Sequence, residues 1–315
     1  MPAIITHYLF GKDVYQQTHP DPFEGPDAFA AFMLGCQGPD ILFYSGLSPK
    51  QLSAATIGSD MHKADPIRLL RSLQDAANML PDDIRGIGQA YVQGFFCHYL
   101  LDSTLHPFIY AQQNALTSAG VDGLDERDGN EVHAEIESEL DVLALSTKEG
   151  ITISSFDPLL PLFASERCVQ VISLLCKYVV KSALGKDIRH DAFESGVNNY
   201  RVILFGLRSP KGIKRKMMGL VERRFRRHSF VQAMSHKNQL ITGSIFDNHT
   251  HEPWTDPQTG EVRTEGFWDL YDSALRTALM ELPRILSASE DDLLKLTGGL
   301  DFNGAPTRPL ILSVS

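Results

Sequence analysis

The sequence predicts an all-α protein, and three observations support this prediction. Apolar residues recur with helical spacing through most of the chain, while a period of two residues is almost absent. Asp, Ser, Pro and Gly residues stand at the positions where helices would begin and end. The composition, with 43% hydrophobic and 22% charged residues, is that of an ordinary globular protein and excludes the disordered, collagen-like and coiled-coil classes.

Aspartate and proline mark the helix ends in the first half of the chain. Asp65 and Pro66 supply an N-cap and a first-turn proline for one helix. A longer helix is expected to end just before Pro107, because proline lacks the backbone N–H that continues a helix. The helices expected in this half cover about residues 28–35, 66–80, 84–105 and 130–145.

The second half of the chain is predicted to hold five more helices. Gly298 and Gly299 close the last of them. Residues 247–266 are rich in turn-forming residues and are expected to form a connection, and the residues after 300 a peripheral strap. The expected helices cover about residues 165–184, 190–206, 211–228, 266–286 and 289–296.

The length of 315 residues is about twice that of a usual domain. We expect a catalytic domain over residues 1–205 and a helical extension over residues 206–315 that packs on the same core. No stretch has the roughly 20 apolar residues of a membrane span, and no secretory signal is present, so a cytoplasmic protein is expected. The four cysteines form no CxxC pair, which predicts buried, reduced thiols.

Charge is spread unevenly along the chain. The net charge of -10 argues against a nucleic-acid coat protein, yet residues 201–237 contain eleven Lys or Arg and one acid, Glu222. Cationic and apolar residues alternate with a helical period in residues 208–228, which is typical of a helix that makes peripheral contact with anionic lipid. Two other interpretations stay open, namely a track for single-stranded nucleic acid and a solvated face packed on the acidic half.

Five of the eleven histidines form a pattern with carboxylates. His98 and Asp102 are four residues apart on a predicted helix, so both project from one face. His133 and Glu137 repeat this spacing on the next long helix. Two facing helices that each offer a histidine and a carboxylate are the arrangement of polynuclear metal sites in helical bundles.

Further side chains are candidates to complete such a site. His106 lies one turn beyond the first pair, although Pro107 indicates that the helix is ending there. Asp40 and His62 are expected to contribute from loops. A histidine among apolar residues is often only a hydrogen-bonded core residue, and acidic residues 135–141 could form one solvated face. The first pair nevertheless lies in an apolar run, where its charges would be costly unless paired or metal-bound.

The segments MPAIITHYLFG, GPD, MH, GFFCHYLLDSTLHP and HAEIE occur in this order over about 140 residues and resemble the zinc-dependent phospholipase C family. That family is related to the single-strand-specific zinc nucleases. The later segment PWTDPQTGE, followed by FWDLYDSA, resembles the C-terminal part of bacterial members. The resemblance implies an all-helical bundle that holds a trinuclear zinc site and cleaves phosphate esters.

The resemblance also implies the ligands of two to three zinc ions. The first set is Asp40, His62, His98 and Asp102; the second shares Asp102 and adds His7 and Pro2, which becomes the N-terminal residue once Met1 is removed; the third is His106, His133 and Glu137. Asp102 is expected to bridge two ions, and Asp40 to orient the attacking water as well as bind metal. These two carboxylates are therefore the predicted catalytic residues.

The sequence thus predicts a zinc-dependent phosphodiesterase that hydrolyses phospholipids or related phosphate esters by attack of metal-activated hydroxide. It is expected in the cytoplasm, with residues 208–228 bringing it to a membrane surface. Two alternatives remain. One is a nuclease of the same fold that cleaves single-stranded nucleic acid, and the other is a non-catalytic, metal-stabilised binding protein.

Overall fold

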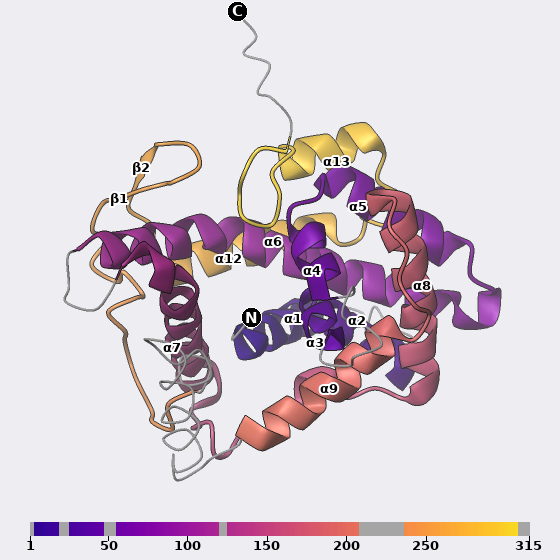
Figure 1. The fold of residues 1–315 in the computed structure, drawn as a ribbon, viewed down its shortest axis with the longest axis horizontal. Coiled ribbons are helices and arrows are strands. Elements are labelled where there is room, and N and C mark those ends of the chain that lie inside the picture. Colours follow the sequence, from indigo (N-terminus) through magenta and orange to yellow (C-terminus); the bar gives the residue numbers. More distant parts are fainter. Residues whose placement is uncertain (1–2, 19–24, 47–54, 120–124, 208–235, 308–315) are drawn as a thin grey trace, which may run out of the picture. The chain divides into compact units, whose positions relative to one another are not determined.

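The chain is mostly helical over the residues that the structure describes, which confirms the predicted all-α class. The computed structural model describes residues 3–18, 25–46, 55–119, 125–207 and 236–307 (Figure 1). Over these ranges there are eleven α-helices, two short 3-10 helices and one two-stranded antiparallel sheet. No helix within these ranges is both long enough and apolar enough to cross a membrane.

Capping residues define several helix ends as the sequence predicts. The Asp65 carboxylate accepts a hydrogen bond of 3.0 Å from the Ile67 N–H and so caps α5, and Gly298 ends α13 in the left-handed region at φ 60°. The elements are α1 (Ile4–Gln17), α2 (Pro26–Gly35), α3 (Asp40–Ser45), α4 (Ala55–His62), α5 (Pro66–Asn78), α6 (Asp82–Ser118), η2 (Glu126–Asp128), α7 (Gly129–Glu149), η3 (Leu160–Leu162), α8 (Glu166–Leu184), α9 (Ala192–Leu207), β1 (Trp254–Thr255), β2 (Val262–Arg263), α12 (Phe267–Glu281) and α13 (Glu290–Thr297).

Helix α6 is longer than predicted, because it continues through Pro107 to Ser118. A proline inside a helix costs about 3 kcal/mol through the lost hydrogen bond and a steric clash. Burial beyond the proline offsets this cost: the ring of Phe108 is fully buried and packs edge-on against Trp254, with 5.4 Å between ring centroids. The predicted helix end at residue 105 is therefore wrong, and His106 lies inside the helix.

Three helices lie where none is predicted, namely α1, α3 and α4. Asp40 is the first residue of α3 and His62 is the last residue of α4, so the prediction that both lie in loops is wrong. Helices of six and eight residues are too short to show a helical period in sequence. They are stabilised by packing, since α3 contacts α4 and α4 contacts α8.

The chain forms two compact units, each assembled from separate stretches. Unit 1 consists of Met1–Phe10, Thr104–Pro161 and Arg201–Ser273, and unit 2 of Gly11–Ser103, Leu162–Tyr200 and Ala274–Ser315. The domain boundary predicted between residues 205 and 206 stays a prediction. The basic segment 208–228, with its predicted helix 211–228, lies outside the described residues.

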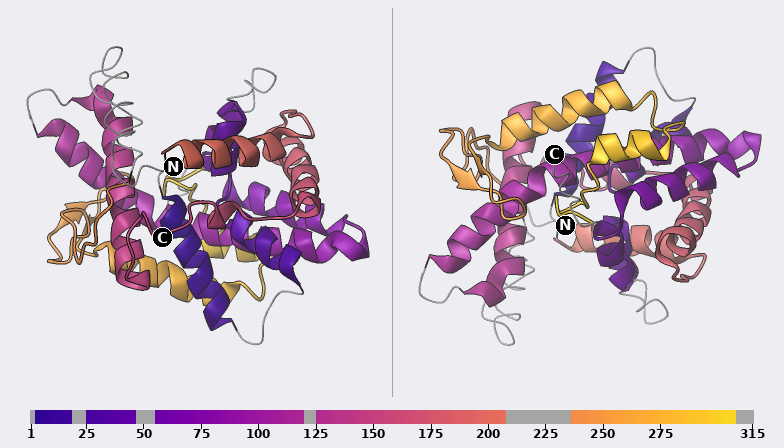
Figure 2. Two further views of the ribbon diagram at one scale, coloured as in Figure 1. Left: turned by 90° about the horizontal axis from the view of Figure 1, so that it is seen from below. Right: turned by 90° about the horizontal axis from the view of Figure 1, so that it is seen from above.

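Unit 2 is organised around helix α5. This helix packs against α8 and α13, and the violet α5 lies beside the yellow α13 in Figure 1 and in the right-hand view of Figure 2. Its buried face includes Ile67, Leu70 and Leu73, which recur at helical spacing. The side-chain amide of Gln74 donates to the carbonyl oxygens of the turn that follows α12, which fixes this turn to the helix.

Unit 1 is held together by a buried carboxylate on α7. Asp141 is fully buried and accepts hydrogen bonds from the N–H groups of Ile5 and Thr6, at 3.2 and 2.7 Å. Its second oxygen also lies 2.8 Å from Nε2 of His236. The two N–H groups belong to the first turn of α1, where helix donors lack partners within the helix. Asp141 therefore fixes the start of α1, and His7 follows directly on that helix.

Candidate metal centre

Four predicted zinc ligands come together in unit 2. Ligand atoms of Asp40, His62 and His98 lie within 4.8 Å of one another. Nε2 of His62 is 3.2 Å from a carboxylate oxygen of Asp40, and Nε2 of His98 is 3.1 Å from a carboxylate oxygen of Asp102. The same oxygen of Asp102 is 3.6 Å from Nε2 of His62. We call these four residues the unit 2 cluster.

The histidine rings of the unit 2 cluster are oriented by backbone carbonyl groups. Nδ1 of His98 lies 3.1 Å from the carbonyl oxygen of Cys36, and Nδ1 of His62 lies 2.7 Å from that of Gly58. A carbonyl oxygen can only accept a hydrogen bond, so each Nδ1 carries the proton. Nε2 of each ring therefore faces the carboxylates and is the atom that would bind a metal ion, once it has lost any proton of its own.

The turn before Asp40 brings the backbone close to the His98 ring. Gly38 has φ 51°, in the left-handed region that favours glycine. A Cβ atom at this position would lie 2.5 Å from Cγ of His98 and still closer to Cδ2. The glycine of the GPD motif therefore leaves room for the His98 ring, a candidate ligand. Asp40 follows Pro39 and begins α3.

Opposite charges compensate for burial in the unit 2 cluster. Burial raises the pKa of the Asp40 carboxyl, but surrounding positive charge, including that of His62 and His98, outweighs it and lowers this pKa to about 2. Burial lowers the pKa of the His98 imidazole, but the charge and hydrogen bond of Asp102 raise it above its usual value. Each buried charge is thus stabilised by its neighbours, and a metal ion bound here would take the place of the imidazole protons.

The third predicted ligand set comes together in unit 1. Ligand atoms of His106, His133 and Glu137 lie within 4.8 Å of one another, and we call these residues the unit 1 cluster. Nε2 of His106 and of His133 lie 3.7 and 3.4 Å from the same carboxylate oxygen of Glu137. Nδ1 of His133 lies 3.0 Å from the side-chain oxygen of Gln113, which orients its Nε2 towards the carboxylate.

Glu137 is the buried acid of the unit 1 cluster, with 3% of its surface exposed. Burial raises the pKa of its carboxyl, but nearby positive charge, including that of His133, and hydrogen bonds from His106 and His133 hold this pKa well below its usual range. The carboxylate is therefore ionised at neutral pH and available to a cation.

The second predicted zinc set stays a prediction. His7 is buried on α1 of unit 1. Pro2 lies outside the described residues.

The donor set of the two clusters fits zinc. Imidazole nitrogen and carboxylate oxygen are the ligands of catalytic zinc sites, whereas structural zinc sites are rich in cysteine. All four cysteines are free and buried, as predicted, and none belongs to either cluster. The unit 1 cluster supplies three ligands, so a tetrahedral zinc ion there would keep one position for water or substrate.

Sequence reasoning missed the groups that orient the ligands. The carbonyl groups of Cys36 and Gly58 have no signal in sequence, because every residue carries a carbonyl group. Gln113 is identifiable only after α6 is known to continue past Pro107. Gly38 could have been found, since a Gly-Pro pair marks a tight turn.

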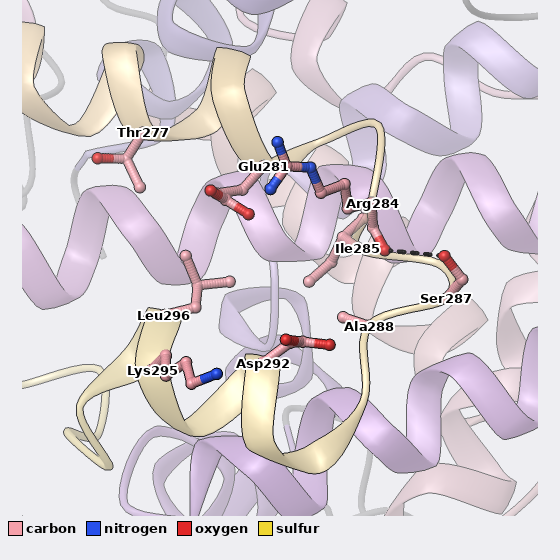
Figure 3. A pocket seen from close by; sticks show the side chains of 9 residues that line it. All are labelled: Thr277, Glu281, Arg284, Ile285, Ser287, Ala288, Asp292, Lys295 and Leu296. Carbon is pink, nitrogen blue, oxygen red and sulfur yellow. Dashed lines mark hydrogen bonds between the residues drawn. The ribbon is translucent and has the colours of Figure 1, made fainter.

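A pocket of about 590 Å³ lies elsewhere in unit 2, between the end of α12 and α13 (Figure 3). Two acids and two bases line it, so its charge does not favour an anionic phosphate group. The lining residues are Thr277, Glu281, Arg284, Ile285, Ser287, Ala288, Asp292, Lys295 and Leu296. None of them is a predicted ligand, and we do not assign this pocket to the metal site.

Comparisons of the chain with protein-family models, with curated proteins and with solved structures found no match. The resemblance to the zinc-dependent phospholipase C family therefore stays a prediction. The case for a metal centre accordingly depends on the geometry of the two clusters.

Proposed function

We propose that the protein is a zinc-dependent hydrolase of phosphodiesters, of the phospholipase C type, that acts on phospholipids or related phosphate esters. One observation carries the proposal: each unit contains a buried cluster in which imidazole Nε2 atoms face a carboxylate. A scaffold that uses metal only for stability needs a single closed site of four ligands. Two clusters, one of them with only three ligands, favour catalysis.

The residues of the unit 2 cluster have distinct parts in this proposal. Zinc bound there would lower the pKa of a coordinated water towards about 7 and polarise a phosphoryl oxygen. Asp40 is ionised at neutral pH, since its pKa is about 2, so its carboxylate can accept a hydrogen bond from water and orient it. Asp102 lies close to both histidines and would balance the charge of the metal.

The unit 1 cluster would hold a further ion. Glu137 supplies the negative charge, and Gln113 holds His133 in the tautomer that presents Nε2. From the resemblance to the family we also propose a second zinc set of His7, Pro2 and Asp102. We also propose that residues 208–228 bring the protein to anionic lipid from the cytoplasm, by attraction between the basic side chains and the lipid head groups.

Metal analysis together with three assays tests the proposal. Zinc content is measured by inductively coupled plasma mass spectrometry, and turnover is measured on phosphatidylcholine vesicles, a chromogenic phosphodiester and single-stranded RNA. We expect two to three zinc ions per chain and cleavage of the lipid and the chromogenic diester. RNA cleavage without lipid cleavage would show a nuclease instead, and one or no metal ion without turnover would show a binding protein.

Asp102 supplies the decisive variant. Asp102→Asn keeps the size of the side chain but removes its charge, so it should lose at least one zinc ion and nearly all turnover. Asp60→Asn is the matched control, because Asp60 lies in the same unit and pairs with Lys186 at the surface, at 2.7 Å. Full zinc content and turnover in Asp102→Asn would refute the assignment.

A further inference from the structure

A C-terminal loop of residues 299–307 follows α13 in unit 2 and is fixed by its own hydrogen bonds. The N–H of Asp301 donates to the carbonyl oxygen of Ala305, at 2.8 Å. The carboxylate of Asp301 accepts from the N–H groups of Asn303 and Ala305, at 2.8 and 3.0 Å. The loop is therefore a defined structure that can present one side chain in a fixed position.

Phe302 is the side chain that this loop presents. It is fully buried, and its ring contacts two histidines of the unit 2 cluster. The ring centroids lie 5.1 Å from that of His62 and 5.8 Å from that of His98. Tyr99 and Phe95 enclose the same ring, at 5.1 and 5.9 Å. Phe302 thus fills the space beside both imidazoles and excludes water from it.

Hydrogen bonds attach the C-terminal loop to the elements that carry these histidines. His62 ends α4, and the last carbonyl groups of a helix lack partners within the helix. The carbonyl oxygen of His62 accepts from the N–H of Phe302 at 3.2 Å and from the side-chain amide of Asn303 at 3.4 Å. The hydroxyl of Tyr99, on α6, donates to the carbonyl oxygen of Leu300 at 2.8 Å.

We infer that the C-terminal loop is part of the metal site and that Phe302 is a positioning residue for His62 and His98. The inference rests on the proposed function, because it assigns a role to the loop in holding zinc. Phe302 contacts the imidazole rings of the two ligands and is not itself a ligand or a reacting group. Any effect it has on the site is therefore exerted through the histidines. Its ring blocks rotation of the two imidazoles, and the dry contact strengthens the electrostatic interactions within the cluster.

The test uses Phe302→Leu in the full-length protein, with Phe193→Leu as the matched control. Phe193 is equally buried in unit 2, but its ring packs against Tyr91. Zinc affinity is measured by competition with a chromophoric chelator in two backgrounds, each of which also carries His7→Ala to remove the second predicted set. In the first background His133→Ala leaves zinc binding to the unit 2 cluster, and in the second His62→Ala leaves it to the unit 1 cluster. We expect Phe302→Leu to weaken zinc binding about 10- to 100-fold in the first background only.

Asn303→Ala provides a second, milder variant should Phe302→Leu fail to fold. It removes one of the two hydrogen bonds to the His62 carbonyl group at a partly exposed position. We expect a several-fold loss of zinc affinity at the unit 2 cluster and a changed absorption spectrum of bound Co²⁺. An unchanged affinity and an unchanged Co²⁺ spectrum in Asn303→Ala would overturn the inference.

The outcomes separate this inference from the proposed function. If the wild type binds zinc and cleaves diesters while Phe302→Leu and Phe193→Leu weaken zinc binding equally, the positioning role is wrong and the proposed function stands. If the wild type binds no zinc, the proposed function fails, and imidazole ¹⁵N spectra of the metal-free protein decide the positioning role. A single Nδ1–H tautomer of His62 that becomes a mixture only in Phe302→Leu supports it, and identical spectra refute it.

Discussion

Replacing Gly38 by alanine should distort the unit 2 cluster, and the structure allows the effect to be estimated. The new Cβ atom would lie 2.5 Å from Cγ of His98, well inside the normal contact distance of about 3.5 Å. The imidazole is fully buried and hydrogen-bonded to the carbonyl group of Cys36, so it cannot move away without losing that bond. The turn that leads to Asp40 must therefore shift as well.

Two contributions determine the size of the effect. An alanine in the left-handed region costs about 1–2 kcal/mol. Overpacking in a buried site adds about 1–3 kcal/mol, which gives a loss of about 2–5 kcal/mol in the free energy of unfolding. Gly185→Ala is the matched control, because Gly185 has φ 68° in the same unit and nothing within 4 Å of its Cβ position. This control should show only the backbone contribution.

Urea unfolding of the metal-free variants, followed by circular dichroism, measures both losses. We expect Gly38→Ala to lose about 1–3 kcal/mol more than Gly185→Ala. Zinc titration of the same proteins should show weaker binding at the unit 2 cluster in Gly38→Ala alone. Equal losses of stability in the two variants, with unchanged zinc affinity, would refute the reasoning.

Three further predictions follow from the described contacts. Glu137→Gln should lose one zinc ion per chain by mass spectrometry, whereas Glu135→Gln on the same helix, which only breaks an ion pair with Lys237, should keep its full zinc content. Asp141→Ala should lower the free energy of unfolding by about 2–5 kcal/mol, because it leaves buried helix N–H groups without an acceptor. If thermal unfolding gave a free energy within about 1 kcal/mol of the wild-type value, this prediction would be contradicted. Burial raises the pKa of the Cys176 thiol to about 12, so above pH 9 the thiol ionises only in the unfolded chain and stability falls as pH rises. The free energy of unfolding should drop by about 1 kcal/mol more in wild type than in Cys176→Ala between pH 9 and 10, as measured by urea unfolding.

Features that depend on neighbouring residues could be predicted from the sequence. The spacing of four residues places His98 beside Asp102 and His133 beside Glu137, because helix geometry alone determines which side chains share a face. The N-cap at Asp65 is equally local. Only the resemblance to a family groups Asp40 and His62 with His98 as ligands of one ion. The three residues lie on three different helices, so no regular spacing in the sequence relates them.

Features that depend on tertiary packing could not be predicted. Helix α6 continues past Pro107 because the residues beyond the proline are buried, and burial is decided by the rest of the fold. The same holds for α3 and α4, which are too short to show a helical period. The contact between His62 and Phe302 joins residues that are far apart in sequence, and no local sequence pattern near either residue predicts it.

The hydrogen bond between the Asn303 side chain and the His62 carbonyl group spans 241 positions of the chain. A ribosome adds about 5–20 residues per second, so roughly 10–50 s separate the synthesis of these two residues. During that time α4 can form, but its last carbonyl group lacks the hydrogen bonds from Phe302 and Asn303, and the His62 ring lacks its contact with Phe302. A nascent chain should therefore capture zinc weakly at this position, and tight binding should begin only when the loop around residue 302 has been made and has folded back.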